Sequence, residues 1–175
     1  MVSVTISHII GTVALIGLFI TVAMNYSIFF GQLQEQATVA QLQGIADYVS
    51  ANLLDLYSVG SNSKGDQFLV KTMDIPSGAA QSSYNVSLVN ISTTFNETGF
   101  AVLVKLTWKP YIYAQSQLPW NGQEGKLLLS NGSLPRGVQS SLVQSKPFVI
   151  SGISTQVLWY CRTGTNVTLG LGVKT

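Results

Sequence analysis

The sequence predicts an α+β protein in which a long N-terminal hydrophobic-then-amphipathic α-helix is followed by an antiparallel, immunoglobulin-like β-sandwich. Three observations support this. No charged side chain occurs before Glu35, so the chain begins with an apolar stretch. The stretch continues into an amphipathic pattern as far as about Tyr57. After a polar linker, the apolar residues recur with a period of two. We therefore expect a helix over residues 1–57, a linker over 58–65 and an outer β domain over 66–175.

The first half of the predicted helix is apolar on all sides. Residues 6–30 are enough to cross a bilayer, and the run is too long for the hydrophobic region of a secretory signal. Such a helix also suits the dry core of a protein filament, where neighbouring copies replace lipid. Gly11 and Gly17 interrupt the run, and glycines let other backbones approach closely, although they are also common in membrane helices. We predict that these two glycines take part in helix–helix packing.

The second half of the predicted helix carries a single apolar stripe. A helix of this length would extend roughly 85 Å at 1.5 Å per residue. We therefore expect its lower half to stand clear of any domain that the chain itself can form. The stripe then needs a partner, and we predict that it packs against the helices of neighbouring copies. Its residues recur at spacings of three and four: Leu42, Ile45, Ala46, Val49, Leu53 and Leu56.

The remainder of the chain reads as short strands separated by clusters of Gly, Pro, Asn and Ser. No helical pattern lies between the runs, which favours an antiparallel sandwich or small barrel. In the run that starts at Phe100, alternate residues form one wholly apolar face and one mixed face. The predicted strands are residues 68–73, 84–95, 100–108, 126–129, 148–150, 153–160 and 167–173.

Composition and motifs argue against several classes of function. Only 9% of the residues are charged, against about 25% in ordinary soluble proteins. The basic residues are scattered singly, so a nucleic-acid-binding face is unsupported. Cys161 is the only cysteine, which leaves no intramolecular disulfide and predicts a small buried hydrophobe. His8 is the only histidine and cannot form a metal cluster alone. With no nucleotide-binding or hydrolase motif, we expect no catalytic, cofactor-binding or metal-binding residues and no enzyme.

Glycosylation sequons are the one motif class with statistical weight. Six of the nine asparagines begin N-x-S/T without proline. Asn25 lies in the apolar helix, where a glycan could not be buried, so we expect it to be unmodified. A β surface that is merely rich in Asn, Ser and Thr would produce the same pattern without glycans. The N-glycosylation candidates are the five in the β domain: Asn85, Asn90, Asn96, Asn131 and Asn166.

Together these features resemble the archaeal type IV pilin superfamily, which includes adhesion pilins, archaellins and membrane-anchored accessory subunits of the archaellum. The resemblance rests on the helix that is apolar first and amphipathic second, the β domain rich in Ser, Thr and sequons, and the lack of a disulfide. It implies a structural subunit of an extracellular, cell-surface helical filament for adhesion or surface contact. The implied partners are identical subunits, the membrane before assembly, the pilus assembly machinery and N-linked glycans, with no cofactor and no nucleic acid.

The first residues also bear on the resemblance. A prepilin leader ends in Lys or Arg followed by Gly, and this chain has no basic residue before Lys64, so a leader has been removed or was never present. Bacterial pilins have a glutamate at the fifth residue of the mature chain, where this chain has Thr5. Archaeal pilins generally lack this glutamate too. Residues 4–10, with Ser7 and His8, resemble accessory archaellum subunits that stay in the membrane. The alternatives are therefore a single-pass membrane-anchored archaellum accessory or S-layer-binding protein, and an enzyme on a membrane tether.

Overall fold

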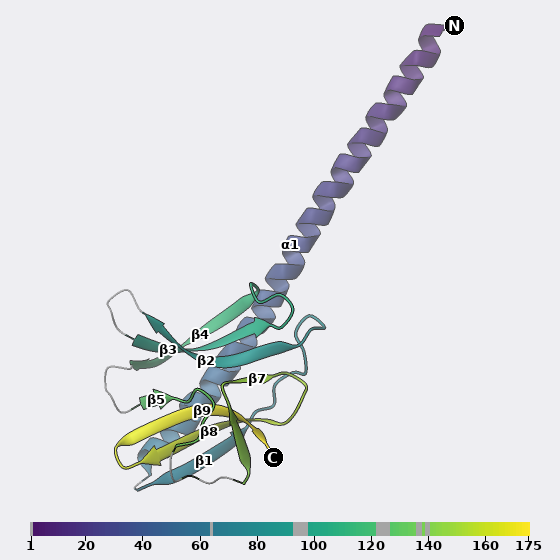
Figure 1. Ribbon diagram of the computed structural model, residues 1–175. Helices are drawn as coiled ribbons and strands as arrows, with labels where there is room; N and C mark the ends of the chain where they lie inside the picture. The colour runs from purple at the N-terminus through teal and green to yellow at the C-terminus, as the bar shows by residue number, and fades with distance from the viewer. Residues whose placement is uncertain (1, 64, 93–97, 122–126, 136–137, 139–140) are drawn as a thin grey trace. The chain divides into compact units, whose positions relative to one another are not determined.

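The computed structural model describes residues 2–63, 65–92, 98–121, 127–135, 138 and 141–175 (Figure 1). The chain divides into two compact units, Met1–Ala37 and Thr38–Thr175, which we call the apolar unit and the outer domain and describe separately. The described residues contain one helix and nine strands: α1 (Val2–Asn62), β1 (Gln67–Thr72), β2 (Tyr84–Ser92), β3 (Thr98–Leu106), β4 (Tyr113–Asn121), β5 (Leu127–Leu129), β6 (Val143–Lys146), β7 (Phe148–Ile150), β8 (Gln156–Thr163) and β9 (Asn166–Lys174).

The predicted N-terminal helix is confirmed, and it continues past Tyr57 to Asn62. The sequence predicts that Gly60, Ser61 and Asn62 belong to the linker, because glycine and small polar residues end helices. The outer domain holds this last turn in place, since the Gln67 side-chain amide donates a hydrogen bond to the Gly60 carbonyl. Tertiary contacts therefore extend the helix beyond its local signal.

The outer domain contains two sheets, one antiparallel and one of mixed pairing. The four-stranded sheet has the order β4-β3-β2-β7 and is antiparallel throughout. In the five-stranded sheet β1, β8 and β9 follow one another, and β5 and β6 both pair with β9. The pairing of β5 with β9 is parallel. The domain is thus α+β, and the predicted antiparallel arrangement is confirmed except at β5.

Two described strands have no counterpart in the strands that the sequence predicts. β4 carries Gln115, Ser116 and Gln117 in its middle, so its apolar residues are too sparse for a period of two to stand out. It also contains Pro119, which an edge strand tolerates because the outer side of an edge needs no ladder donor. β6 is a four-residue edge strand with a polar composition. Both strands form through pairing with a neighbour.

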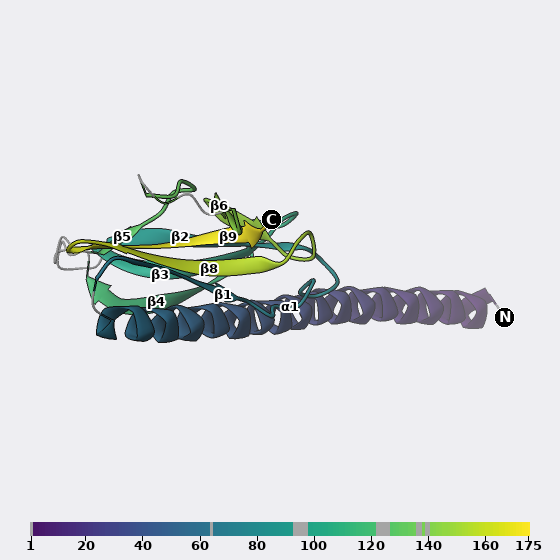
Figure 2. The same cartoon turned by 90° about the horizontal axis from the view of Figure 1, so that it is seen from below.

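The helical part of the outer domain lies alongside the edge strands β1 and β4 (Figure 2). At β4, the Gln43 side-chain amide donates to the Gln115 carbonyl over 3.3 Å. Further along, the ring of Tyr57 lies 4.7 Å from that of Trp120, centroid to centroid. On the other side Lys71 of β1 forms an ion pair with Asp55. The helix therefore closes the side of the domain that lies between the two edge strands.

One hydrophobic core joins the helix and both sheets, and this overturns the predicted role of the apolar stripe. Leu42, Ala46, Val49 and Leu53 are all 0% exposed within the chain's own domain. Burying each large side chain contributes about 1.5–3 kcal/mol to the stability of the domain. The prediction that Leu42, Ile45, Val49, Leu53 and Leu56 pack against neighbouring helices is therefore wrong: Ile45 and Leu56 are only 7% and 6% exposed.

The physical reason for this correction lies in the two sheets. Each sheet has an apolar inner face, and β1 and β4 end those sheets on the side that the helix occupies. An amphipathic helix supplies the third apolar surface that such a core needs. The length of the helix alone gave no information on this, because an extended helix can lie against a domain as well as stand clear of it.

A smaller cluster covers the other face of the five-stranded sheet. Trp159 and Cys161 are 0% and 2% exposed there, packed with Val143 and Val157 and with the partly buried Phe68. The prediction that Cys161 is a small buried hydrophobe is confirmed. β8 is thus buried on both faces, which explains its nearly continuous apolar sequence.

Candidate assembly surface

The apolar unit exposes its side chains on every face of the helix. Each large apolar side chain from Ile9 to Leu33 that the structure shows exposed is between 44% and 68% accessible. An 18-residue window of this helix has a mean hydropathy of 2.0, and none of it is buried in the chain. A soluble monomer rarely exposes an apolar patch of more than about 300–600 Å². This surface therefore needs lipid or protein to cover it.

Three polar side chains within the apolar unit bond to their own helix. Thr12 donates to the His8 carbonyl over 2.8 Å, and Thr21 donates to the Gly17 carbonyl over 2.9 Å. Asn25 donates to the Thr21 carbonyl over 2.8 Å. These bonds return to the carbonyl four residues earlier, as polar side chains do in helices surrounded by apolar groups. They make the segment compatible with lipid and with a dry helix bundle.

The chain itself gives no reason for glycine at Gly11 or Gly17. Among the residues that the structure describes, a Cβ atom at either position would meet no group beyond its own stretch of helix backbone within 4 Å. Glycine costs about 1 kcal/mol in a helix relative to alanine. The two glycines are therefore open to close approach from another helix, which is the role that the sequence predicts for them.

The structure places four of the five predicted glycosylation sites, and Asn96 lies outside the described residues. Asn90, Asn131 and Asn166 are exposed, whereas Asn85 is partly buried. β2 pairs with β3 in an unbroken register, so Asn85 and Asn90 point to opposite faces of the sheet. Asn90 is accessible because it stands near the end of β2. Asn85 stands between β3 and β7, and its side-chain oxygen accepts a hydrogen bond from Thr107 over 3.3 Å.

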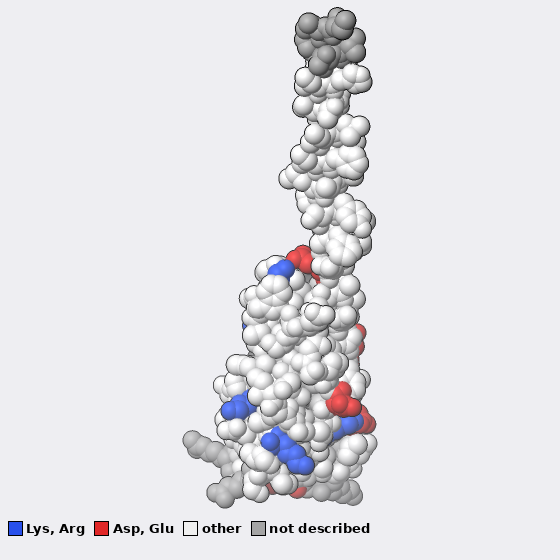
Figure 3. All heavy atoms as spheres, turned by 90° about the vertical axis from the view of Figure 1, so that its right-hand side faces the viewer, with Lys and Arg blue, Asp and Glu red and all other residues white. Residues whose placement is uncertain are grey.

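Charged side chains are few and do not gather in one place on the face that Figure 3 displays. Among the described residues, no group of three or more His, Cys, Asp or Glu side chains could hold a metal ion. His8 is exposed in the apolar unit. Asp55 and Lys71 form an ion pair at the surface, where such a pair contributes about 0–1 kcal/mol. The described charges therefore outline no metal-binding arrangement.

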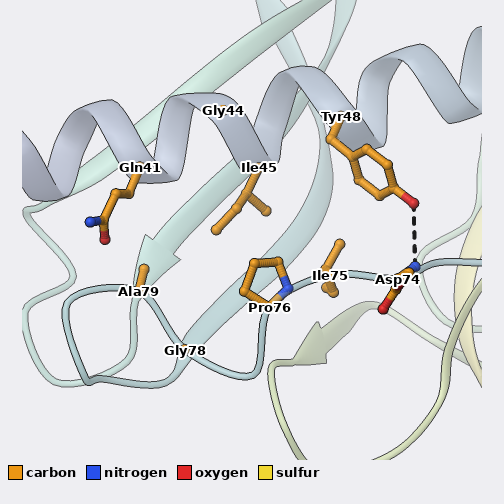
Figure 4. Close-up of a pocket in the computed structure, with 9 residues that line it drawn as sticks. All are labelled: Gln41, Gly44, Ile45, Tyr48, Asp74, Ile75, Pro76, Gly78 and Ala79. Atoms are coloured by element: carbon orange, nitrogen blue, oxygen red, sulfur yellow. Dashed lines mark hydrogen bonds between the residues drawn. The ribbon is translucent and has the colours of Figure 1, made fainter.

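A groove of about 480 Å³ lies between the helix of the outer domain and the segment that joins β1 to β2 (Figure 4). Its polar groups hold that segment in place. The backbone N–H of Asp74 donates to the Tyr48 hydroxyl over 3.3 Å, and the N–H of Ala80 donates to the Gln41 side-chain oxygen over 3.0 Å. Ala80 and Gln81 have positive φ angles of 47° and 60° in a tight turn. The groove thus marks where a loop is attached to the helix.

Gln41 and Tyr48 are structural anchors that the sequence did not single out. Both lie beside the apolar stripe, where polar residues are usually assigned to solvent. Neither residue has a local partner that periodicity could have revealed, because the groups they bind lie 39 and 26 residues away.

Comparison with known proteins returned no match among family models, curated proteins or solved structures.

Proposed function

We propose that this chain is a structural subunit of an extracellular helical filament of the archaeal type IV pilus kind, serving adhesion or surface contact. Subunits would first be inserted in the membrane and would then assemble by bundling their apolar units. The outer domains would lie on the outside of the filament and carry N-linked glycans. Localisation would be the cell surface. In this proposal the outer domain is immunoglobulin-like in having two sheets face a common core, which the amphipathic part of α1 completes.

A single observation supports the proposal most strongly: the apolar unit is uncovered. Its side chains from Ile9 to Leu33 find no cover within the chain. A helix bundle of identical subunits would bury this surface at each step of assembly, with no energy source needed for the packing itself. Gly11 and Gly17 add sites for close backbone approach within such a bundle.

The burial of the apolar stripe removes one reason for preferring a filament over a membrane anchor. With Leu42 to Leu56 inside the outer domain, that part of α1 no longer requires a neighbouring helix. The same uncovered apolar unit would serve a single-pass protein whose outer domain binds the S-layer or an archaellum component. This anchored protein is therefore the second candidate, and it differs from the first only in what finally surrounds residues 8–33.

Electron microscopy and immunolabelling of sheared cell-surface material distinguish the two candidates. A filament subunit should be found in thin filaments released by shear, and the filaments should dissociate in detergent to single chains. Recovery of the chain solely from detergent-solubilised membrane would contradict the filament and favour the anchored protein. The matched control is a known integral membrane protein of the same cells, which shear should leave in the membrane fraction.

A further inference from the structure

The loop between β3 and β4 presents aromatic side chains to the outside. Trp108 and Tyr111 are 63% and 66% exposed, among the most exposed large side chains of the outer domain. The Lys109 ammonium lies 4.7 Å from the centre of the Trp108 ring and 6.0 Å from that of Tyr111. Tyr113, the first residue of β4, is 54% exposed. Aromatic rings with a polar group at one end and a lysine among them form an amphipathic surface.

The loop is held in a defined conformation. The N–H of Ile112 donates to the Lys109 carbonyl over 2.9 Å, which closes a turn with Pro110 in its second position. The Ile112 carbonyl accepts from Leu106, and the Ile112 side chain is 6% exposed. The Trp108 indole N–H donates to the Ser82 hydroxyl over 2.7 Å. The rings are thus exposed from a rigid turn, so their ordering costs little on binding.

The loop lies at one particular end of the outer domain. β4 and the helix run side by side, with Gln43 beside Gln115 and Tyr57 beside Trp120. The residues before Gln115 therefore continue toward Thr38, where the chain enters the domain from the apolar unit. We call this the proximal end. The Ala80 turn, bound to Gln41, lies at this same end and adjoins Trp108 through Ser82.

A short segment of chain joins the proximal end to the apolar unit. Residues 31–37 are the only link between Phe30 and Thr38. Even fully extended, that link spans no more than about 28 Å, and as helix about 12 Å. When residues 8–30 lie in lipid, Thr38 is therefore tethered within this distance of the hydrocarbon, to which the headgroup layer adds about 5–8 Å on each side.

We propose that the β3–β4 loop is a membrane-interface anchor, in which Trp108 and Tyr111 insert among phospholipid headgroups while the apolar unit spans the bilayer. Tryptophan and tyrosine prefer this layer because their rings are apolar and carry a polar N–H or O–H group at one end. The anchor fixes the depth of the helix and the orientation of the outer domain before assembly. This inference rests on the membrane-inserted stage of the proposed function.

The test uses the full chain in phospholipid liposomes and the fluorescence of its tryptophans. Trp159 is 0% exposed and Trp120 is partly buried, so both act as internal references for Trp108. A lipid with a nitroxide label near the headgroup should quench the unmodified protein about twofold more than Trp108→Phe. A label deep in the acyl chain should quench the two proteins equally. Aqueous iodide should reach Trp108 less well in liposomes than in detergent.

A matched control moves the exposed tryptophan to the distal end. Leu128 of β5 is 53% exposed and pairs with Thr168 of β9, which pairs with Cys161 of β8. The neighbour of Cys161, Tyr160, lies against Gly60 in the last turn of α1. The double variant W108F/L128W therefore carries a tryptophan of similar exposure far from Thr38. The headgroup label should leave this tryptophan unquenched, because the length of the outer domain separates it from the membrane.

Flotation of the liposomes after an alkaline carbonate wash reports insertion independently. If the chain floats and the headgroup label quenches unmodified protein and Trp108→Phe alike, the loop anchor is wrong while the membrane stage stands. If the chain does not float, both are wrong. If Trp108 is open to iodide in liposomes and shielded in sheared filaments, the loop contacts another copy, and the lipid assignment is overturned.

Discussion

At the residue scale, neighbouring leucines in α1 lie in opposite environments. Leu53 is 0% exposed in the core, and Leu54 is 38% exposed. Leu53→Ala should lower the free energy of unfolding of the outer domain by about 2–5 kcal/mol because it leaves a cavity. Leu54→Ala should cost less than about 1 kcal/mol. Urea unfolding of the full chain in mild detergent, followed by tryptophan fluorescence, measures both. Equal effects would contradict the packing of the stripe within its own domain.

Tyr84 makes the stability of the outer domain sensitive to alkali. Burial raises the pKa of Tyr84 from 10.0 to about 12, and its hydroxyl donates to the Pro76 carbonyl over 2.6 Å. The folded protein thus binds this proton more tightly than the unfolded chain. The resulting stability is complete below pH 10 and is lost as the pH rises toward 12, by about 3 kcal/mol in all. Burial also raises the pKa of Tyr160, in the same direction.

Urea midpoints measured between pH 7 and pH 12 test this expectation. Tyr84→Phe should reduce the alkaline loss of stability, leaving the part due to Tyr160. It should cost about 1 kcal/mol at neutral pH, where the hydrogen bond to Pro76 is removed. An alkaline loss of unchanged size in the variant would show that another group is responsible.

At the element scale, two glycines within α1 have opposite surroundings. A Cβ atom at Gly44 would meet nothing within 4 Å, whereas one at Gly60 would lie 2.5 Å from the ring of Tyr160. Gly44→Ala should therefore stabilise the outer domain by up to about 1 kcal/mol through helix propensity. Gly60→Ala should destabilise it by about 1–3 kcal/mol, because the fully buried Tyr160 ring has no room to move. Thermal unfolding of both variants in the same detergent is the measurement.

The stability of the Gly60→Ala variant also tests why α1 continues to Asn62. If Gly60→Ala is neutral or stabilising, then the close approach of Tyr160 does not hold the last turn. In that case the Gln67 hydrogen bond to the Gly60 carbonyl is left as the contact that extends α1 to Asn62.

At the scale of the whole molecule, assembly can be separated from folding by changing Gly17. Beyond the local helix backbone, no described part of the chain lies within 4 Å of a Cβ at this position, so the isolated subunit accommodates a larger side chain. Gly17→Leu should reduce filament yield strongly while leaving the unfolding of the outer domain unchanged, because the added atoms hold helices apart. Gly17→Ala, a smaller change, is the matched control. Normal filaments from Gly17→Leu in electron micrographs would count against a close-packed helix bundle.

The distribution of glycans should follow exposure. Asn90, Asn131 and Asn166 are exposed and should carry glycans in native material, whereas Asn85 lies within the four-stranded sheet and should be modified less. Asn25, bonded to Thr21 within the apolar unit, should be unmodified. Glycopeptide mass spectrometry gives the occupancy of each site. A chain without glycans would leave the sequons as a feature of composition and remove the main support for an extracellular surface.

The features that depend on a local pattern were predictable from the amino-acid sequence. Charge-free residues over several turns specify an apolar helix, and alternation specifies strands such as β3, because burial on one face has a fixed period in each case. Exposure of the apolar unit follows from the same pattern. A helix that is apolar on every side cannot be covered on every side by one small domain. The glycosylation candidates follow from the N-x-S/T motif, which can be recognised without knowledge of the fold.

Which surfaces meet became clear from the folded structure. Periodicity shows that Leu42 and Leu53 need an apolar partner, and it cannot show whether that partner is another chain or the open side between β1 and β4. β4 escaped prediction because pairing with β3, rather than its own residues, makes it a strand. The positions of Gln41 and Trp108 depend on hydrogen bonds to Ala80 and Ser82, which lie far from them in the sequence. Such contacts depend on the tertiary fold, which brings residues far apart in the sequence together, and a local sequence pattern contains no information on that.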